Sequence, residues 1–133
     1  MQTQIARGIT ISLPFPPREL SPNSRAPWRA KAQETAAYRR QAGWLARMAM
    51  VAKEPGTFPL TPPVTATVTF TLKNRRRRDL DNLLASIKAV WDGIVDAGIL
   101  RDDNAFSLHI SLAPVIVGKP GVSIRLEEIQ HGK

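Results

Sequence analysis

Four aspartates in one stretch of the chain are spaced so that they could bind a divalent metal ion. Asp79 and Asp81 follow four consecutive arginines, and Asp102 and Asp103 stand side by side further along. In an extended backbone, residues two apart point to the same face. Carboxylates brought together need a counter-charge, and Mg²⁺ is a hard cation that prefers oxygen ligands. Since such a cation also activates water and neutralises phosphate, the pattern predicts metal-dependent phosphodiester hydrolysis.

These aspartates also have ordinary structural explanations. Asp81 precedes a helical pattern and could serve as its N-cap. Asp102 and Asp103 form a pair of a kind that is common in turns. The cap accounts for one of the four aspartates, so we interpret the group as metal ligands.

The charge of the chain is uneven. Its formal net charge is +8 and its pI about 10.9, a balance that favours polyanionic partners such as nucleic acid. Residues 1–78 hold 14 Lys/Arg against 3 Asp/Glu, whereas residues 79–103 hold 2 against 6. A basic body around one acidic region is the distribution that a metal-dependent nuclease needs, because the body attracts the backbone and the acidic region holds the cation.

Basic residues next to the aspartates are candidates for binding a DNA backbone. A run of four arginines could be a solvated charge run, but its position beside carboxylates favours phosphate binding. The proline-rich segment 14–27 is rich in polar and basic groups and could line a substrate groove or be a plain connector. The expected nucleic-acid contacts are Arg75, Arg76, Arg77, Arg78, Arg29 and Lys73.

A helix is predicted between the two acidic pairs. Its apolar spacings of three and four make a wide buried face, and Gly98 is a natural stop. Lys88 lies seven residues after Asp81 and would share its stripe, where it could reach a phosphate held by the aspartates. An ion pair with Asp92 four residues on is an equally good explanation of this lysine. The apolar face consists of Leu83, Leu84, Ile87, Val90, Trp91, Ile94 and Val95.

The length of this helix separates the two pairs. A helix over residues 82–97 is about 24 Å long, at ~1.5 Å per residue. Asp81 and Asp103 would then flank opposite ends of it and could not share a metal unless the helix broke or the chain turned back. The alternative hypothesis is a homodimer in which Asp79 and Asp81 of one chain meet the partner's Asp102 and Asp103.

The remaining periodic segments predict an α+β domain. Residues 8–13 and 64–73 alternate as strands do, and residues 105–113 and 122–129 predict two more. Residues 29–53 predict an amphipathic helix with a basic outer face. The order β-α-β-α-β-β gives a small mixed sheet of about four strands with two main helices, in one domain over residues 1–133.

Several side chains in these segments have expected positions. In the strand after the aspartates, alternation places Phe106 on the same face as Leu108. His109 falls on the opposite face, as a solvated strand residue does. Tyr38 and Trp44 are expected to pack rather than to stack on bases. The apolar positions of the first helix are Ala36, Ala37, Leu45, Met48 and Val51.

Composition excludes several classes of protein. The 133 residues contain no cysteine, so disulfides and thiolate metal sites are absent and a reducing compartment fits. No run approaches the ~18 apolar residues of a membrane span, and the N-terminal residues lack the apolar core of a signal peptide. We therefore expect a cytoplasmic protein with no membrane partner. Nothing in the sequence indicates a small-molecule organic cofactor.

The central stretch resembles a known family, the RusA-type Holliday junction resolvases of bacteria and their prophages. The resemblance is carried by RRRRDLDNL, a lysine-bearing helix that ends in D-x-x-x-x-AG, and a DD pair. It extends to LPFPP near the N-terminus and to SPNSR with Trp28 and Arg29. In the enzyme that gives the family its name, the lysine follows DLDN more closely than here. An insertion of about one helical turn would preserve the helix face.

The resemblance implies a Mg²⁺-dependent endonuclease, with Mn²⁺ as a possible substitute, that works as a homodimer. It implies paired symmetric nicks in four-way DNA junctions, in recombination and repair. By the family pattern Asp79, Asp81 and Asp103 are the metal-binding catalytic carboxylates, Asp102 is their acidic neighbour and metal contact, and Lys88 is the catalytic lysine. Two alternatives stay open: a non-catalytic basic DNA-binding module, and a metal nuclease that acts on other branched or linear DNA.

Overall fold

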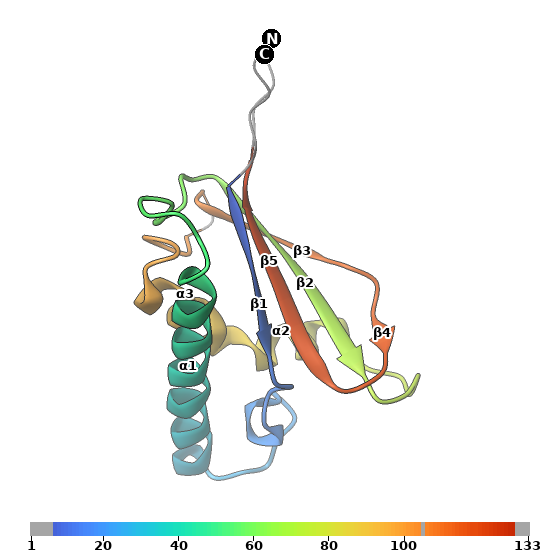
Figure 1. Ribbon diagram of the computed structural model, residues 1–133. Coiled ribbons are helices and arrows are strands. Elements are labelled where there is room, and N and C mark those ends of the chain that lie inside the picture. The colour runs from blue at the N-terminus through green and yellow to red at the C-terminus, as the bar shows by residue number, and fades with distance from the viewer. Residues whose placement is uncertain (1–6, 105, 130–133) are drawn as a thin grey trace.

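The computed structural model describes residues 7–104 and 106–129 and consists of a mixed sheet with helices packed against it (Figure 1). The strand order is β1-β5-β2-β3, and β4 also pairs with β2. β5 is antiparallel to β1 and to β2, whereas β3 and β4 are parallel to β2. In chain order the elements are β1 (Gly8–Leu13), η1 (Arg18–Leu20), α1 (Trp28–Met50), β2 (Val64–Leu72), α2 (Leu80–Ser86), α3 (Lys88–Ala97), β3 (Leu108–Leu112), β4 (Ile116–Val117) and β5 (Gly121–Glu128).

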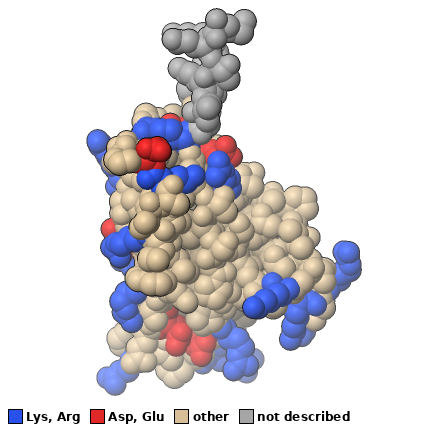
Figure 2. All heavy atoms as spheres, in the orientation of Figure 1, with Lys and Arg blue, Asp and Glu red and all other residues tan. Residues whose placement is uncertain are grey.

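The predicted α+β class and mixed sheet are confirmed. β2 is the centre of the sheet, and its alternation is visible in its burial: Val64, Ala66, Val68, Phe70 and Leu72 are buried, and the threonines between them are half-buried. The buried side chains meet apolar residues of β1, β5 and the helices in one core. The opposite face of the sheet is polar, and the middle of the surface in Figure 2 carries few charges. No helix within the described residues is both long and apolar enough to cross a bilayer.

The prediction of a single helix over residues 82–97 is wrong. The structure has two helices, α2 and α3, with a break at Ile87 (φ −105°, ψ 15°). The Ser86 hydroxyl donates to the Leu83 carbonyl at 2.6 Å, a local bond of the type that bends helices. Ile87 itself is fully buried, so the break directs its side chain into the core.

The strand predicted over residues 105–113 is shorter than expected. β3 begins at Leu108, and Phe106 lies outside it with 91% of its side chain exposed. Its predicted place on a face with Leu108 is therefore wrong, because a turn interrupts the extended backbone before the strand begins. A fifth strand, β4, lies between the strands predicted over residues 105–113 and 122–129 and was not predicted. His109 is exposed, as predicted.

The first helix packs through one aromatic side chain and a set of small residues. Its buried residues are Tyr38, Ala42, Gly43 and Ala46, whereas Met48 and Val51 are exposed. Tyr38 is a packing residue, as predicted, and its hydroxyl donates to the Pro14 carbonyl at 2.8 Å. Packing of Trp44 was predicted wrongly, because its side chain is 59% exposed. The small residues Ala42, Gly43 and Ala46 allow α1 to lie close to α3. Arg39 of α1 also forms an ion pair with Asp96 of α3 through two hydrogen bonds.

Close approach of α1 and α3 predicts a specific effect on stability. A methyl group added at Gly93 would stand 2.6 Å from the Arg39 carbonyl oxygen. In an open helix Gly→Ala stabilises by about 1 kcal/mol. We expect Gly93→Ala instead to lower the free energy of unfolding by about 1–3 kcal/mol in urea titrations, as overpacking does. Gly43→Ala, with its nearest contact at 3.3 Å, should cost less. A Gly93→Ala protein as stable as its parent would contradict this packing.

Candidate functional site

Asp79 ends the arginine run and caps α2. Its backbone is extended (φ −82°, ψ 125°), and its carboxylate accepts a hydrogen bond from the Asp81 backbone N–H at 2.9 Å. The N-cap is thus Asp79, and the expectation that Asp81 takes this role is wrong. One oxygen of the cap suffices for that bond, so the other stays available to a cation.

Asp79 and Asp81 form the first acidic site, at the beginning of α2. Both side chains are exposed, and Asp81 lies in the first turn of the helix. Extended backbone was predicted to point both carboxylates to one face. This prediction is wrong, because only Asp79 is extended and the helix begins at Leu80. The two residues are joined instead by the cap, because the Asp79 carboxylate accepts from the Asp81 backbone N–H.

Asp102 and Asp103 form the second acidic site, in the turn before β3. The Asp102 carboxylate accepts from the Asn104 side-chain amide at 2.9 Å and from its backbone N–H at 3.2 Å. These hydrogen bonds from Asn104 hold the pKa of Asp102 below its usual range, so it stays ionised. Asp103 is exposed. The Val64 N–H donates to the Ser107 carbonyl at 2.8 Å, so this turn is attached to the beginning of β2.

The two acidic sites lie at opposite ends of the sheet. The second is attached where β2 begins, and the first follows where β2 ends. Nine residues of strand span roughly 26 Å at ~3.3 Å per residue. A Mg²⁺–oxygen bond is only about 2 Å long. Accordingly, no three His, Cys, Asp or Glu side chains of the described residues are close enough together to hold one metal ion.

Lys88 is the first residue of α3 and is exposed. The break at Ile87 interrupts the continuous stripe that was expected to join it to Asp81. The alternative explanation, an ion pair with Asp92, is not found either. Within residues 7–104 and 106–129 the ion pairs are Arg7–Glu128, Arg39–Asp96 and Arg125–Glu127. Lys88 instead borders a hollow between α2, α3 and β3.

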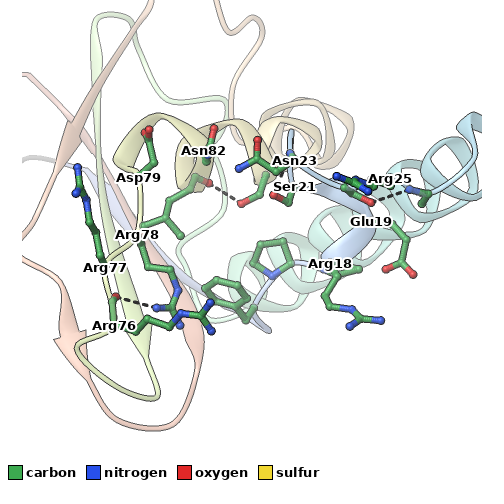
Figure 3. Close-up of a pocket in the computed structure, with 17 residues that line it drawn as sticks. Arg18, Glu19, Ser21, Asn23, Arg25, Arg76, Arg77, Arg78, Asp79 and Asn82 are labelled. Carbon is green, nitrogen blue, oxygen red and sulfur yellow. Dashed lines mark hydrogen bonds between the residues drawn. The ribbon is translucent and has the colours of Figure 1, made fainter.

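A groove of about 1080 Å³ runs beside the first acidic site. We call it the arginine groove. Figure 3 shows the arginine run on one side of it and the proline-rich loop with Arg18 and Arg25 on the other. Asp79, which caps α2, and Asn82 on that helix lie between them. Five arginines line the groove, against two carboxylates, those of Glu19 and Asp79. The arginines are Arg18, Arg25, Arg76, Arg77 and Arg78.

The arginine run is irregular rather than a strand, because β2 ends at Leu72. Its shape is fixed by hydrogen bonds from the Arg78 guanidinium to the Arg76 carbonyl at 2.8 Å and from the Arg76 N–H to the Asn74 side chain at 3.0 Å. Basic side chains gather at this end of the molecule in Figure 2. Such a concave basic surface suits a phosphodiester backbone.

Sequence reasoning found part of this surface. Of the expected nucleic-acid contacts, three line the groove, whereas Arg75, Arg29 and Lys73 are exposed outside it. Arg18 and Arg25 were missed as individual residues. The basic, proline-rich composition of their loop was the available signal. Their meeting with the arginine run is a tertiary contact that no local pattern specifies.

Comparison with known proteins gives the family context. The family model described as endodeoxyribonuclease RusA matches residues 15–127, which include both acidic sites and the arginine groove. The chain is 37% identical over 68 residues to a crossover junction endodeoxyribonuclease RusA of Aquifex aeolicus. That aligned region covers 50% of this chain and 51% of that protein. It is 34% identical over 102 residues to an uncharacterized protein of Xylella fastidiosa. That aligned region covers 75% of this chain and 63% of the relative. The matched regions thus span about half of the first relative and under two thirds of the second.

Proposed function

The chain belongs to the RusA endodeoxyribonuclease family, and we propose that it resolves four-way DNA junctions by paired, divalent-metal-dependent nicks. The observation that carries the proposal is the arginine groove, which leads directly to the exposed Asp79. A basic groove that ends at a carboxylate is suited to guide a phosphodiester to a cation. The relative from Aquifex bears the name of a crossover junction endodeoxyribonuclease, which supports the choice of substrate.

The metal-binding residues of this proposal are Asp79 and Asp81 of one protomer and the partner's Asp103. Carboxylates are the right donors for Mg²⁺, and Mn²⁺ would also suit them. Within the described part of one chain they do not assemble into a group of three, which supports completion of the set by a second copy. When bound, the cation supplies a counter-charge for the phosphate and lowers the pKa of a water. A two-fold dimer then carries two sites, which suits nicks in two symmetric strands.

Other residues act on the substrate itself. Lys88 is exposed at the start of α3 and can offer an ammonium group to the negative charge that develops on the phosphoryl group. Asp102, ionised and bonded to Asn104, keeps the second turn in shape and adds negative charge beside Asp103. The arginines of the groove bind the strand on both sides of Asp79.

Cleavage of a synthetic four-way junction beside a linear duplex of equal length tests this function. We expect paired nicks in opposite strands of the junction, with Mg²⁺ or Mn²⁺ and not without it. Asp79→Asn should lower the cleavage rate at least ~100-fold, because a lost ligand costs more than a lost outer partner. Folding should persist, since Asn is also a good N-cap.

The matched control is Asp96→Asn, which removes a carboxylate that is already paired with Arg39 and does not line the arginine groove. It should cleave at the parent rate. If the linear duplex is cut equally well, the protein is a metal nuclease of broader substrate range and not a junction resolvase. If no DNA is nicked with either metal, the alternative of a non-catalytic DNA-binding module is supported.

The role of the proline-rich loop has its own test. Arg25→Ala should raise the Kd for a junction several-fold and lower the slope of log K against log salt by about one unit, as loss of one phosphate contact does. Arg125→Ala is the control, because this arginine lies in β5 beside Glu127, outside the groove. Indistinguishable salt slopes for the two variants would remove the loop from the DNA path.

A further inference from the structure

The outer face of α1 carries a large aromatic ring in solvent. The helix turns small residues, among them Ala42, Gly43 and Ala46, toward the core, whereas the side chain of Trp44 is 59% exposed. Tryptophan and arginine are the residues most enriched where protein surfaces bind their partners. The surroundings of Trp44 therefore indicate what this face of the helix can bind.

A hollow of about 730 Å³ opens beside the ring, between α1 and α3. We call it the α1 hollow. Its lining includes Trp44, the three arginines Arg39, Arg40 and Arg47, and one carboxylate, that of Asp96. It shares no lining residue with the arginine groove. Its volume lies within the ~300–1,000 Å³ of sites that accept small ligands, so one nucleotide unit of a strand can enter it.

The charge of the α1 hollow favours an anion. Its one carboxylate is neutralised, because the Arg39 guanidinium donates to Asp96 through two hydrogen bonds, at 2.7 and 2.9 Å. Arg47 donates to the Asp96 backbone carbonyl at 3.2 Å, which holds its guanidinium at the hollow. Among residues 7–104 and 106–129, neither Arg40 nor Arg47 forms an ion pair. Two positive charges thus remain for a ligand.

The spacing of these two arginines places one on each side of the ring. Arg40 lies four residues before Trp44 and Arg47 three residues after it, and side chains at these spacings are neighbours on a helix surface. Seven residues rise about 10 Å along the helix axis. The helix as a whole is basic, with five Lys/Arg against one Asp/Glu. Basic side chains recur in Figure 2 along the edge of the molecule where Figure 1 places α1.

We propose that the outer face of α1 binds single-stranded nucleic acid, with a base stacked on Trp44 and the flanking phosphates held by Arg40 and Arg47. Aromatic rings set among cations are the means by which proteins bind unpaired strands without reading their sequence. A duplex offers no free base face to the ring, since each base is covered by its neighbours. An acidic peptide would satisfy the arginines but would leave the ring unused.

This site is separate from the proposed nuclease function and does not depend on it. The arginine groove and Asp79 bind and cut a strand, whereas the α1 hollow contains no unpaired carboxylate among the described residues and offers only a ring and cations. It gives the protein a second hold, on an unpaired stretch of DNA or RNA.

Tryptophan fluorescence tests the stacking, in buffer without divalent metal so that no strand is cut. The chain has three tryptophans, of which Trp91 is buried and Trp28 is 76% exposed. In a Trp28→Phe protein the remaining exposed tryptophan is Trp44. We expect an oligothymidylate of four nucleotides to quench its emission saturably, because a stacked base contacts the indole ring. Oligouridylate of the same length tests RNA, and quenching by either strand supports the proposal. Unchanged emission with both would overturn it.

Two arginine variants in the same Trp28→Phe background locate the binding. Arg40→Ala should raise the Kd for the quenching strand several-fold and lower the slope of log K against log salt by about 0.7, as loss of one single-strand phosphate contact does. Arg40→Lys, which keeps the charge, should recover most of the affinity. Arg25→Ala, in the arginine groove, is the control and should leave the Kd measured by quenching at the parent value. An equal effect of Arg25→Ala would mean that Trp44 reports on the groove, and it would overturn a separate site.

Competition with tetraglutamate separates a nucleic acid from an acidic protein partner. At the concentration at which the four-nucleotide strand saturates, tetraglutamate should leave the quenching by that strand unchanged. Complete displacement at equal concentration would assign the face to an acidic peptide and overturn the proposal. The nuclease function is tested apart from this one, because a protein that nicks no DNA and yet shows the quenching keeps the single-strand site alone.

Discussion

The length of β2 is the constraint on which the rest of the structure depends. Its buried side chains fix it in the centre of the sheet, and the parallel pairing of β3 returns the chain to the end where β2 begins. The second acidic site is consequently attached at one end of a rigid strand and the first follows at the other. The carboxylates at the two ends do not form a group that could hold a metal ion within the described residues. Both acidic sites are exposed to solvent.

The break between α2 and α3 determines where Lys88 lies relative to the first acidic site. A continuous helix would carry Lys88 on the stripe of Asp81. With the break at Ile87, α2 is a short element capped by Asp79, and α3 is free to pack closely on α1 through Gly93. Lys88 then borders the hollow beside β3 rather than the arginine groove. Lys88 and Asp79 thus line two different hollows.

Sequence reasoning reached the parts of the molecule that local patterns specify. The alternation in residues 64–73 predicts β2, and the structure confirms it. The charged spacing predicts that Asp79, Asp81, Asp102 and Asp103 are metal ligands, which stays a prediction. Sequence reasoning missed the break at Ile87, because spacings of three and four fit one helix or two, and the bond from the Ser86 hydroxyl has no periodic signature. It misplaced Phe106, because alternation continues through the turn that Asn104 organises. The arginine groove joins two segments far apart in sequence, so it needed the tertiary structure.

The central claim is that each metal site takes carboxylates from two chains, and a mixing experiment tests it most directly. Asp79→Asn and Asp103→Asn proteins are each expected to be inactive alone. After the two are unfolded together and refolded, half of the dimers should be mixed, and each mixed dimer should hold one intact site and one doubly altered site. The account predicts that about a quarter of the parent's cleavage activity returns, as single rather than paired nicks in a four-way junction. A mixture as inactive as either variant alone would contradict it.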